Sequence, residues 1–183
     1  ERCAAIADEF GDPTTAVMAT WLLGSPHFLA GDQAAAQHHC ERALALSTVS
    51  GHAELKFFGY DHRTRGLISL ALTLWLRGQP LRAIATARQA VDEATSHGPV
   101  DVSIALTFST LVLLLAGEIE AAEERIEKAI AHATKYSLRH FEAVSRGIKG
   151  ALLIVKGNPM AGVELLRAAL ATLQADRHNI TVT

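Results

Sequence analysis

Aromatic residues are scarce in this sequence: Phe, Trp and Tyr together make up 5% of its 183 residues. β-Strands favour aromatic and β-branched side chains, so this scarcity speaks against a β-rich fold. Ala and Leu dominate instead, and both lose little conformational freedom in a helix. Hydrophobic residues form 49% of the chain, which suffices for an ordinary core or a short array of helices. We therefore expect an all-α fold.

The sequence also has no long run of basic residues. Seventeen Lys and Arg against nineteen Asp and Glu leave a formal net charge of −2. A surface that binds nucleic acid needs clustered cations to displace the counterions of the phosphates. We therefore expect no direct contact with nucleic acid.

Cysteines are few, and long apolar runs are missing. Two Cys, Cys3 and Cys40, cannot build a disulfide framework and indicate the reduced thiols of a cytoplasmic protein. The most apolar stretch, 102–116, is fifteen residues long, whereas a membrane span needs about 20. We interpret it as a buried helix and expect no membrane contact. The chain has no initiator Met and no signal-peptide pattern, and we expect it to be a fragment of a longer protein.

Sequence motifs that carry chemistry are absent too. The glycines form neither a phosphate-binding loop nor a dinucleotide fingerprint, and no His-Glu-x-x-His is present. His38, His39 and Cys40 are adjacent, but three consecutive helical residues point in different directions and cannot converge on one metal ion. No signature of a nucleophile surrounds Cys40, which we expect in the core. The sequence predicts no enzyme, no metal site and no cofactor.

What the chain does have is an internal repeat. Four glycines, Gly31, Gly78, Gly117 and Gly157, each follow an apolar stretch and precede an amphipathic one, at spacings of 47, 39 and 40 residues. Gly readily adopts the positive φ that ends a helix. Counted from each Gly, position 13 holds a larger apolar residue (Leu44, Val91, Ile130, Leu170). Small residues stand seven before, five after and twelve after the Gly: Gly24, Ala36, Ala43; Ala71, Ala83, Ala90; Thr110, Ala122, Ala129; Gly150, Gly162, Ala169. Small residues at fixed positions let two helices approach closely.

This pattern resembles the tetratricopeptide repeat (TPR), although the period is about 40 rather than 34 and the closing Pro is missing. The resemblance implies a right-handed α-α superhelix of helical hairpins. We expect one domain over 1–183, with about four hairpins, each made of two helices, and a leading helix at 2–10. The predicted helices are 13–30 with 32–48, 60–77 with 79–97, 100–116 with 118–136, and 139–156 with 158–176.

Local residues predict how several helices begin. Asp32 and Asn158 follow a turn glycine and are candidates to cap the next helix with their side chains. Pro80 and Pro159 stand where a first-turn proline is tolerated.

In the TPR family the first helices of the hairpins line a concave surface that binds the ligand. The main positions that correspond here are Trp21, Phe28, Arg65, Trp75, Phe108 and Leu111, accompanied by Leu22, Ser25, Ser69, Leu72, Thr107, Ile148 and Ala151. This candidate groove is more apolar than a typical peptide groove. Either a tight superhelix buries these residues, or they form an apolar trough for a ligand or partner segment.

The segment 59–65 is the most polar and specific-looking part of the chain. One interpretation is structural, with Asp61 capping the following helix. The other is a polar binding patch formed by Tyr60, His62 and Arg63 with Arg65.

The segments 58–63, 74–79 and 165–170 resemble the C-terminal helical arrays of bacterial transcriptional regulators that carry a winged-helix domain and a signal-transduction ATPase. This resemblance implies a non-catalytic domain that senses a small-molecule inducer or binds a protein or peptide segment. An alternative is a general peptide-binding assembly or chaperone-adaptor scaffold, but its basic carboxylate clamp would have only Arg65. Exposed ends of the array also predict self-association, for example as a homodimer.

Overall fold

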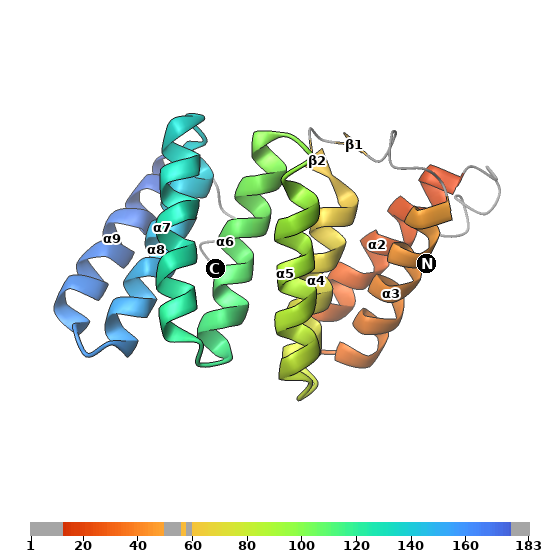
Figure 1. Ribbon diagram of the computed structural model, residues 1–183, viewed down its shortest axis with the longest axis horizontal. Coiled ribbons are helices and arrows are strands. Elements are labelled where there is room, and N and C mark those ends of the chain that lie inside the picture. Colours follow the sequence, from red (N-terminus) through yellow and green to blue (C-terminus); the bar gives the residue numbers. More distant parts are fainter. Residues whose placement is uncertain (1–12, 50–55, 58–59, 177–183) are drawn as a thin grey trace. The chain divides into compact units, whose positions relative to one another are not determined.

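A computed structural model describes residues 13–49, 56–57 and 60–176 and places eight helices in them (Figure 1). The all-α class is confirmed, and the leading helix predicted at 2–10 lies outside the described residues. The helices are α2 (Pro13–Leu29), α3 (Gln33–Val49), α4 (His62–Leu76), α5 (Pro80–Ala94), α6 (Pro99–Leu115), α7 (Ile119–Lys135), α8 (Arg139–Val155) and α9 (Pro159–Ala175).

We call the consecutive pairs hairpin 1 (α2 and α3), hairpin 2 (α4 and α5), hairpin 3 (α6 and α7) and hairpin 4 (α8 and α9). The chain divides into two compact units, Glu1–Asp101 and Val102–Thr183. The single domain over 1–183 stays a prediction. In the first unit α2 contacts α3 and α4, α3 contacts α4, and α4 contacts α5. In the second unit α7 contacts α8, and α8 contacts α9.

The turn inside each hairpin follows the prediction. The four turn glycines have φ between 71° and 85°, a region that residues with a Cβ rarely adopt. Asp32 caps α3, because its Oδ1 accepts a hydrogen bond from the backbone N of Ala35 at 3.0 Å. Helices α5 and α9 begin at Pro80 and Pro159, as predicted.

The predicted side-chain cap at Asn158 is wrong. Asn158 precedes α9 but makes no side-chain capping hydrogen bond. Its φ of −113° and ψ of 67° depart from the extended backbone that capping residues usually adopt. Its backbone carbonyl instead accepts a hydrogen bond from Gly162 N at 3.1 Å.

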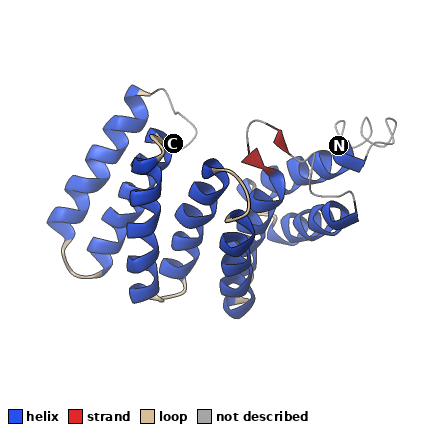
Figure 2. Cartoon of the chain, turned by 45° about the horizontal axis from the view of Figure 1, so that its top comes forward, coloured by secondary structure: helices blue, strands red, loops and turns tan. Residues whose placement is uncertain are grey.

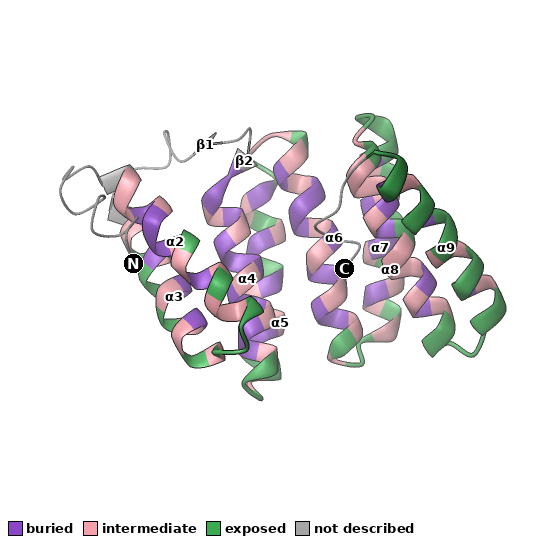
Figure 3. Ribbon diagram, turned by 180° about the vertical axis from the view of Figure 1, so that it is seen from behind, coloured by how far each residue is buried: buried purple, intermediate pink, exposed green. Residues whose placement is uncertain are grey.

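The small residues of the repeat lie where helices touch. The alanines five and twelve positions after the turn glycines are 0–4% exposed. Figure 3 shows that buried and exposed positions alternate along the helices. Hairpin 4 has the closest approach: a Cβ on Gly150 would lie 2.7 Å from the carbonyl oxygen of Gly162. No side chain larger than hydrogen fits there without displacing a helix.

One local feature differs from the prediction. A helix was expected from residue 60, whereas Lys56–Phe57 (β1) and Tyr60–Asp61 (β2) form a short antiparallel ladder, drawn in red in Figure 2. Helix α4 begins only at His62, because Asp61 has an extended φ of −80° and ψ of 121°. Its side chain accepts a hydrogen bond from Arg63 N. The structural interpretation of Asp61 as a helix cap is thereby confirmed.

Candidate functional site

The predicted polar patch is built into hairpins 1 and 2. Arg63 is held by Glu93 of α5 through Nε–Oε2 at 2.7 Å and Nη2–Oε1 at 3.1 Å. Its Nη1 donates to the carbonyl oxygen of Leu44 at 3.3 Å and to Ser47 Oγ at 2.9 Å, both in α3. Only 10% of its side chain is exposed, so Arg63 joins three helices.

His62, the second residue of the predicted patch, is buried. His62 is 2% exposed, and its ring lies 5.3 Å from the ring of Trp21. The side chain of Tyr60 is not among those that the structure describes. The patch as a partner-binding site stays a prediction.

Sequence reasoning missed a buried acidic pair beside this patch. The backbone N of Asp61 donates to Asp101 Oδ1 at 2.6 Å, and Asp61 Oδ2 lies 3.3 Å from Nδ1 of His97. Asp101 also accepts a hydrogen bond from Gly98 N at 3.3 Å. Both aspartates are at most 3% exposed. Because the two lie 40 residues apart in sequence, no local pattern signals the pair, which fastens the start of α4 to the start of α6.

Cys40 lies in the core of hairpin 1, as predicted. It is 1% exposed, and a Cβ on Gly24 would lie 3.1 Å from its Sγ. Burial raises the pKa of the Cys40 thiol to about 11, and the adjacent Glu41 carboxylate adds to the rise. Within the described ranges, no three His, Cys, Asp or Glu side chains are placed to hold a metal ion. None of the helices described is long and apolar enough to cross a membrane.

The main candidate-groove residues, Trp21, Phe28, Arg65, Trp75, Phe108 and Leu111, are all partly buried. Trp21 is covered by hairpin 2: its Cδ1 lies 3.7 Å from the position of a Cβ on Gly66. This cover agrees with the interpretation that the repeat buries Trp21 internally. Ligand binding by the remaining residues stays a prediction.

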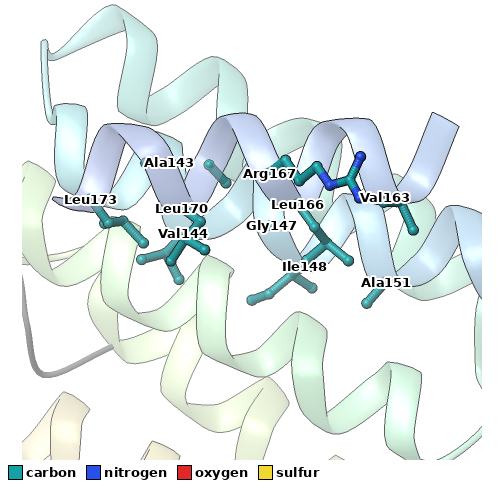
Figure 4. A pocket seen from close by; sticks show the side chains of 11 residues that line it. Ala143, Val144, Gly147, Ile148, Ala151, Val163, Leu166, Arg167, Leu170 and Leu173 are labelled. Carbon is teal, nitrogen blue, oxygen red and sulfur yellow. The ribbon is translucent and has the colours of Figure 1, made fainter. Parts of the chain in front are cut away.

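An open apolar groove lies on hairpin 4, between α8 and α9 (Figure 4). Its volume is about 480 Å³, and Arg167 is its single charged lining residue. Figure 4 shows Val144 and Ile148 on the α8 side, with Leu166 and Leu170 on the α9 side. We call this the end groove; its lining is Ala143, Val144, Gly147, Ile148, Ala151, Val163, Leu166, Arg167, Ala169, Leu170 and Leu173.

On hairpin 1 the equivalent face is covered by the next helix, α4. Leu44 holds the same repeat position as Leu170, thirteen residues after the turn glycine. Leu44 packs against α4, with its Cδ2 3.5 Å from a Cβ position on Gly66. His62, Arg63 and Gly66 of α4 close the corresponding space, which shrinks to about 10 Å³. Among the described residues, only α8 and α9 line the corresponding space on hairpin 4, and Leu170 is 40% exposed. Figure 3 shows α9 largely exposed.

The prediction from the sequence found only part of this groove. Ile148 and Ala151 were assigned to the ligand-binding surface, and both line it. The residues of α9 were missed, because the TPR resemblance assigns the binding surface to first helices alone. Their signal was present in the sequence: Leu170 holds the position thirteen after the turn glycine, at which Leu44 of hairpin 1 packs against the next hairpin.

Neither a scan against models of protein families nor a search of curated proteins finds a match. Among solved structures, the chain is similar to TPR-like repeats of a Podosopora anserina protein described as a putative kinesin light chain. One structure, of a single-substitution form of these repeats, gives a TM-score of 0.65 at 16% identity, covering 90% of this chain and 77% of that one. A second structure of the repeats gives 0.62 at 18% identity, covering 89% and 77%. The chain therefore has the TPR-like fold.

Proposed function

We propose that this chain is a non-catalytic interaction domain that binds a protein or peptide segment through the end groove. The observation that carries the proposal is the open apolar face on hairpin 4. The equivalent face of hairpin 1 is closed by α4, whereas the end groove offers about 480 Å³ with ten uncharged lining residues and one arginine. An apolar cleft with one charged group is typical of sites that take up an amphipathic segment.

We further propose that the domain belongs to a bacterial transcriptional regulator of the signal-transduction ATPase class and works in the cytoplasm. The sequence resemblance over 58–63, 74–79 and 165–170 supports this context. A partner segment or a small-molecule inducer bound to the repeats would then change the state of the ATPase. Reading the complete gene tests it: a winged-helix domain and a phosphate-binding loop upstream are expected, and their absence would contradict the regulator context.

A selection from a displayed peptide library tests the interaction itself. Peptides that bind the chain are expected to lose binding to the Leu170→Asp variant, because a carboxylate in the end groove would be buried against apolar side chains. Leu81→Asp is the matched control, since Leu81 of α5 is 83% exposed and lies outside the groove. Failure to select any binder, or binders equally sensitive to both variants, would contradict the proposal.

A further inference from the structure

We infer that a second cavity on hairpin 4 binds a small organic carboxylate between Arg139 and Arg146. This cavity has a volume of about 250 Å³. We call it the arginine cavity; its lining is Arg139, Glu142, Ala143 and Arg146 of α8 with Ala168, Ala169 and Thr172 of α9. It is a separate site that does not depend on the proposed function, because its lining and that of the end groove share only Ala143 and Ala169.

The arginine cavity is not the face that α4 covers on hairpin 1. The space that α4 closes there is lined on hairpin 1 by Val17, Trp21, Ala43, Leu44 and Ser47. Counted from the turn glycines, these residues correspond to the end groove: Ala143, Gly147, Ala169, Leu170 and Leu173. The hairpin 1 residues that correspond to Glu142, Arg146, Ala168 and Thr172 do not line that space: Ala16, Thr20, Arg42 and Leu46.

Short side chains on α9 leave room for the arginine cavity. Eleven residues after the turn glycine, hairpin 4 has Ala168 where the other hairpins have long side chains: Arg42, Gln89 and Lys128. Fifteen residues after the turn glycine, hairpin 2 has Glu93, whose carboxylate holds Arg63 of the paired helix. Hairpin 4 has the shorter Thr172 at that position. The cavity therefore follows from residues that distinguish hairpin 4 from the other three.

The positive charge of the cavity is also particular to hairpin 4. Eleven residues before the turn glycine stands Arg146, where the other hairpins have uncharged residues: Thr20, Leu67 and Leu106. The side chain of Arg146 is 48% exposed, whereas Thr20 and Leu67 are buried. Arg139, seven residues earlier in α8, brings a second guanidinium group to the same cavity.

Both guanidinium groups keep donors for a ligand. Arg146 uses Nε and Nη2 on a single oxygen of Glu142, at 3.0 Å and 2.9 Å. Arg139 Nε lies 3.5 Å from Asp176 Oδ2, and the side chain of Arg139 is 71% exposed. Within the described residues, Nη1 of Arg146 and the terminal nitrogens of Arg139 make no hydrogen bond. Exposed ion pairs contribute little to stability, so a ligand can replace Asp176 at small cost.

The charge and the size of the cavity indicate the class of ligand. Two arginines and one glutamate leave the lining with a charge of +1, which one carboxylate neutralises. The planar fork of a guanidinium group matches the two oxygens of a carboxylate. Three alanines of the lining offer methyl groups to the carbon atoms of the ligand. The volume is below the range of about 300–1,000 Å³ typical of drug-sized ligands, so the ligand is compact.

An NMR titration of the ¹⁵N-labelled chain 1–183 with sodium butyrate tests the inference. Sodium chloride and sodium phosphate at the same ionic strength are the comparisons. Butyrate is expected to shift the amide signals of α8 and α9 along a saturable curve. Phosphate is expected to bind more weakly, because it has no carbon atoms to contact the alanines. Shifts that do not saturate, or equal affinities for butyrate and phosphate, would overturn the inference.

Two substitutions test the guanidinium groups. Arg139→Gln and Arg146→Gln are each expected to weaken butyrate binding about tenfold, because each removes charged hydrogen bonds to the ligand. Arg88→Gln is the matched control, since it removes the same charge from an exposed residue of α5 outside the cavity. An affinity that is unchanged in Arg146→Gln, or equally reduced in Arg88→Gln, would contradict the assignment.

Ala168→Gln tests the cavity without changing its charge. It introduces at this position the residue that hairpin 2 has there, Gln89. Ala168 is exposed and glutamine is a good helix former, so the helix content measured by circular dichroism is expected to stay the same while butyrate binding is lost. Butyrate binding that persists in Ala168→Gln but disappears in Leu170→Asp would place the ligand in the end groove, and would overturn the inference.

Discussion

Three histidines lie together on hairpin 1. The ring of His39 stacks on that of His27 at 5.3 Å and lies 5.5 Å from that of His38. The pKa of His39 is lowered mainly by burial, then by the charges of His27, His38 and Arg42, while Asp32 acts in the opposite direction. Protonation therefore costs more in the folded chain than in the unfolded one.

This lowered pKa predicts a dependence of stability on pH. Below the ordinary pKa of 6.5, the unfolded state binds more protons at His39 than the folded state, so the free energy of unfolding falls as the pH falls. The Tm of the chain is expected to drop from about pH 7.5 to about pH 5.5, and to drop less in His39→Gln. His132→Gln, in α7, is the control. An equal drop in His39→Gln and the unaltered chain would disprove the role of His39.

The Arg63–Glu93 pair offers a second prediction at single residues. Arg63→Ala is expected to lower the free energy of unfolding by about 2 kcal/mol, because it removes charged hydrogen bonds to Glu93, Ser47 and Leu44 at a site that is 10% exposed. Arg82→Ala is the matched control. Its pair with Glu41 is about half exposed on both sides, and such pairs contribute at most about 1 kcal/mol. Urea unfolding measures both, and equal losses would contradict the structural role of Arg63.

At the scale of elements, the packing of α8 on α9 depends on glycine at one position and not at another. A Cβ on Gly150 would lie 2.7 Å from the Gly162 carbonyl oxygen and 2.9 Å from Leu166 Cγ. A Cβ on Gly147, one turn earlier, would meet Ala169 Cβ at an ordinary 3.6 Å. The same substitution at the two sites therefore has opposite consequences.

Gly150→Ala is expected to lower the free energy of unfolding by about 1–3 kcal/mol, because the two backbones must move apart. Gly147→Ala is expected to raise it by about 0.5–1 kcal/mol, since alanine restricts the unfolded chain and fits the helix. Denaturant unfolding of the two variants checks the pair. A gain in Gly150→Ala would show that the contact between α8 and α9 is looser than described.

The helices and their turns could be predicted because their causes are local. A turn glycine needs a positive φ, and small residues at fixed distances from it pack against the paired helix. The helix ends were less accurate. The predicted helix 79–97 ends at Ala94, where the hydroxyls of Thr95 and Ser96 donate to the carbonyls of Asp92 and Glu93. Such bonds compete with continuation of the helix.

The candidate site could be predicted only in part, because its contacts join distant residues. The partner of Arg63 is 30 residues away, and that of Asp61 is 40 residues away. A polar stretch looks the same in sequence whether its side chains face a partner or each other. The end groove likewise combines residues of α8 with residues of α9, which come together only when hairpin 4 has folded.

At the scale of the whole molecule, the described helices contact mainly their neighbours in sequence. Stability in such arrays is close to a sum of the stabilities of the repeats and of the interfaces between them. The two compact units meet in sequence between Asp101 and Val102, inside α6. A destabilising substitution in hairpin 4 should therefore increase local opening mainly in the unit Val102–Thr183.

Hydrogen exchange of the Gly150→Ala variant tests this expectation. The amides of α8 and α9 are expected to exchange about tenfold faster than in the unaltered chain, which corresponds to a loss of about 1.4 kcal/mol in local opening. The amides of α4 and α5 are expected to keep their rates, because these helices belong to the other compact unit and pack mainly on each other and on hairpin 1.

The reciprocal substitution, Arg63→Ala, should accelerate amide exchange in α3, α4 and α5 and leave the exchange rates of α8 and α9 unchanged. If either variant accelerates amide exchange equally in all helices, the chain unfolds as one cooperative unit. That result would contradict a stability that is the sum of repeats and neighbouring interfaces.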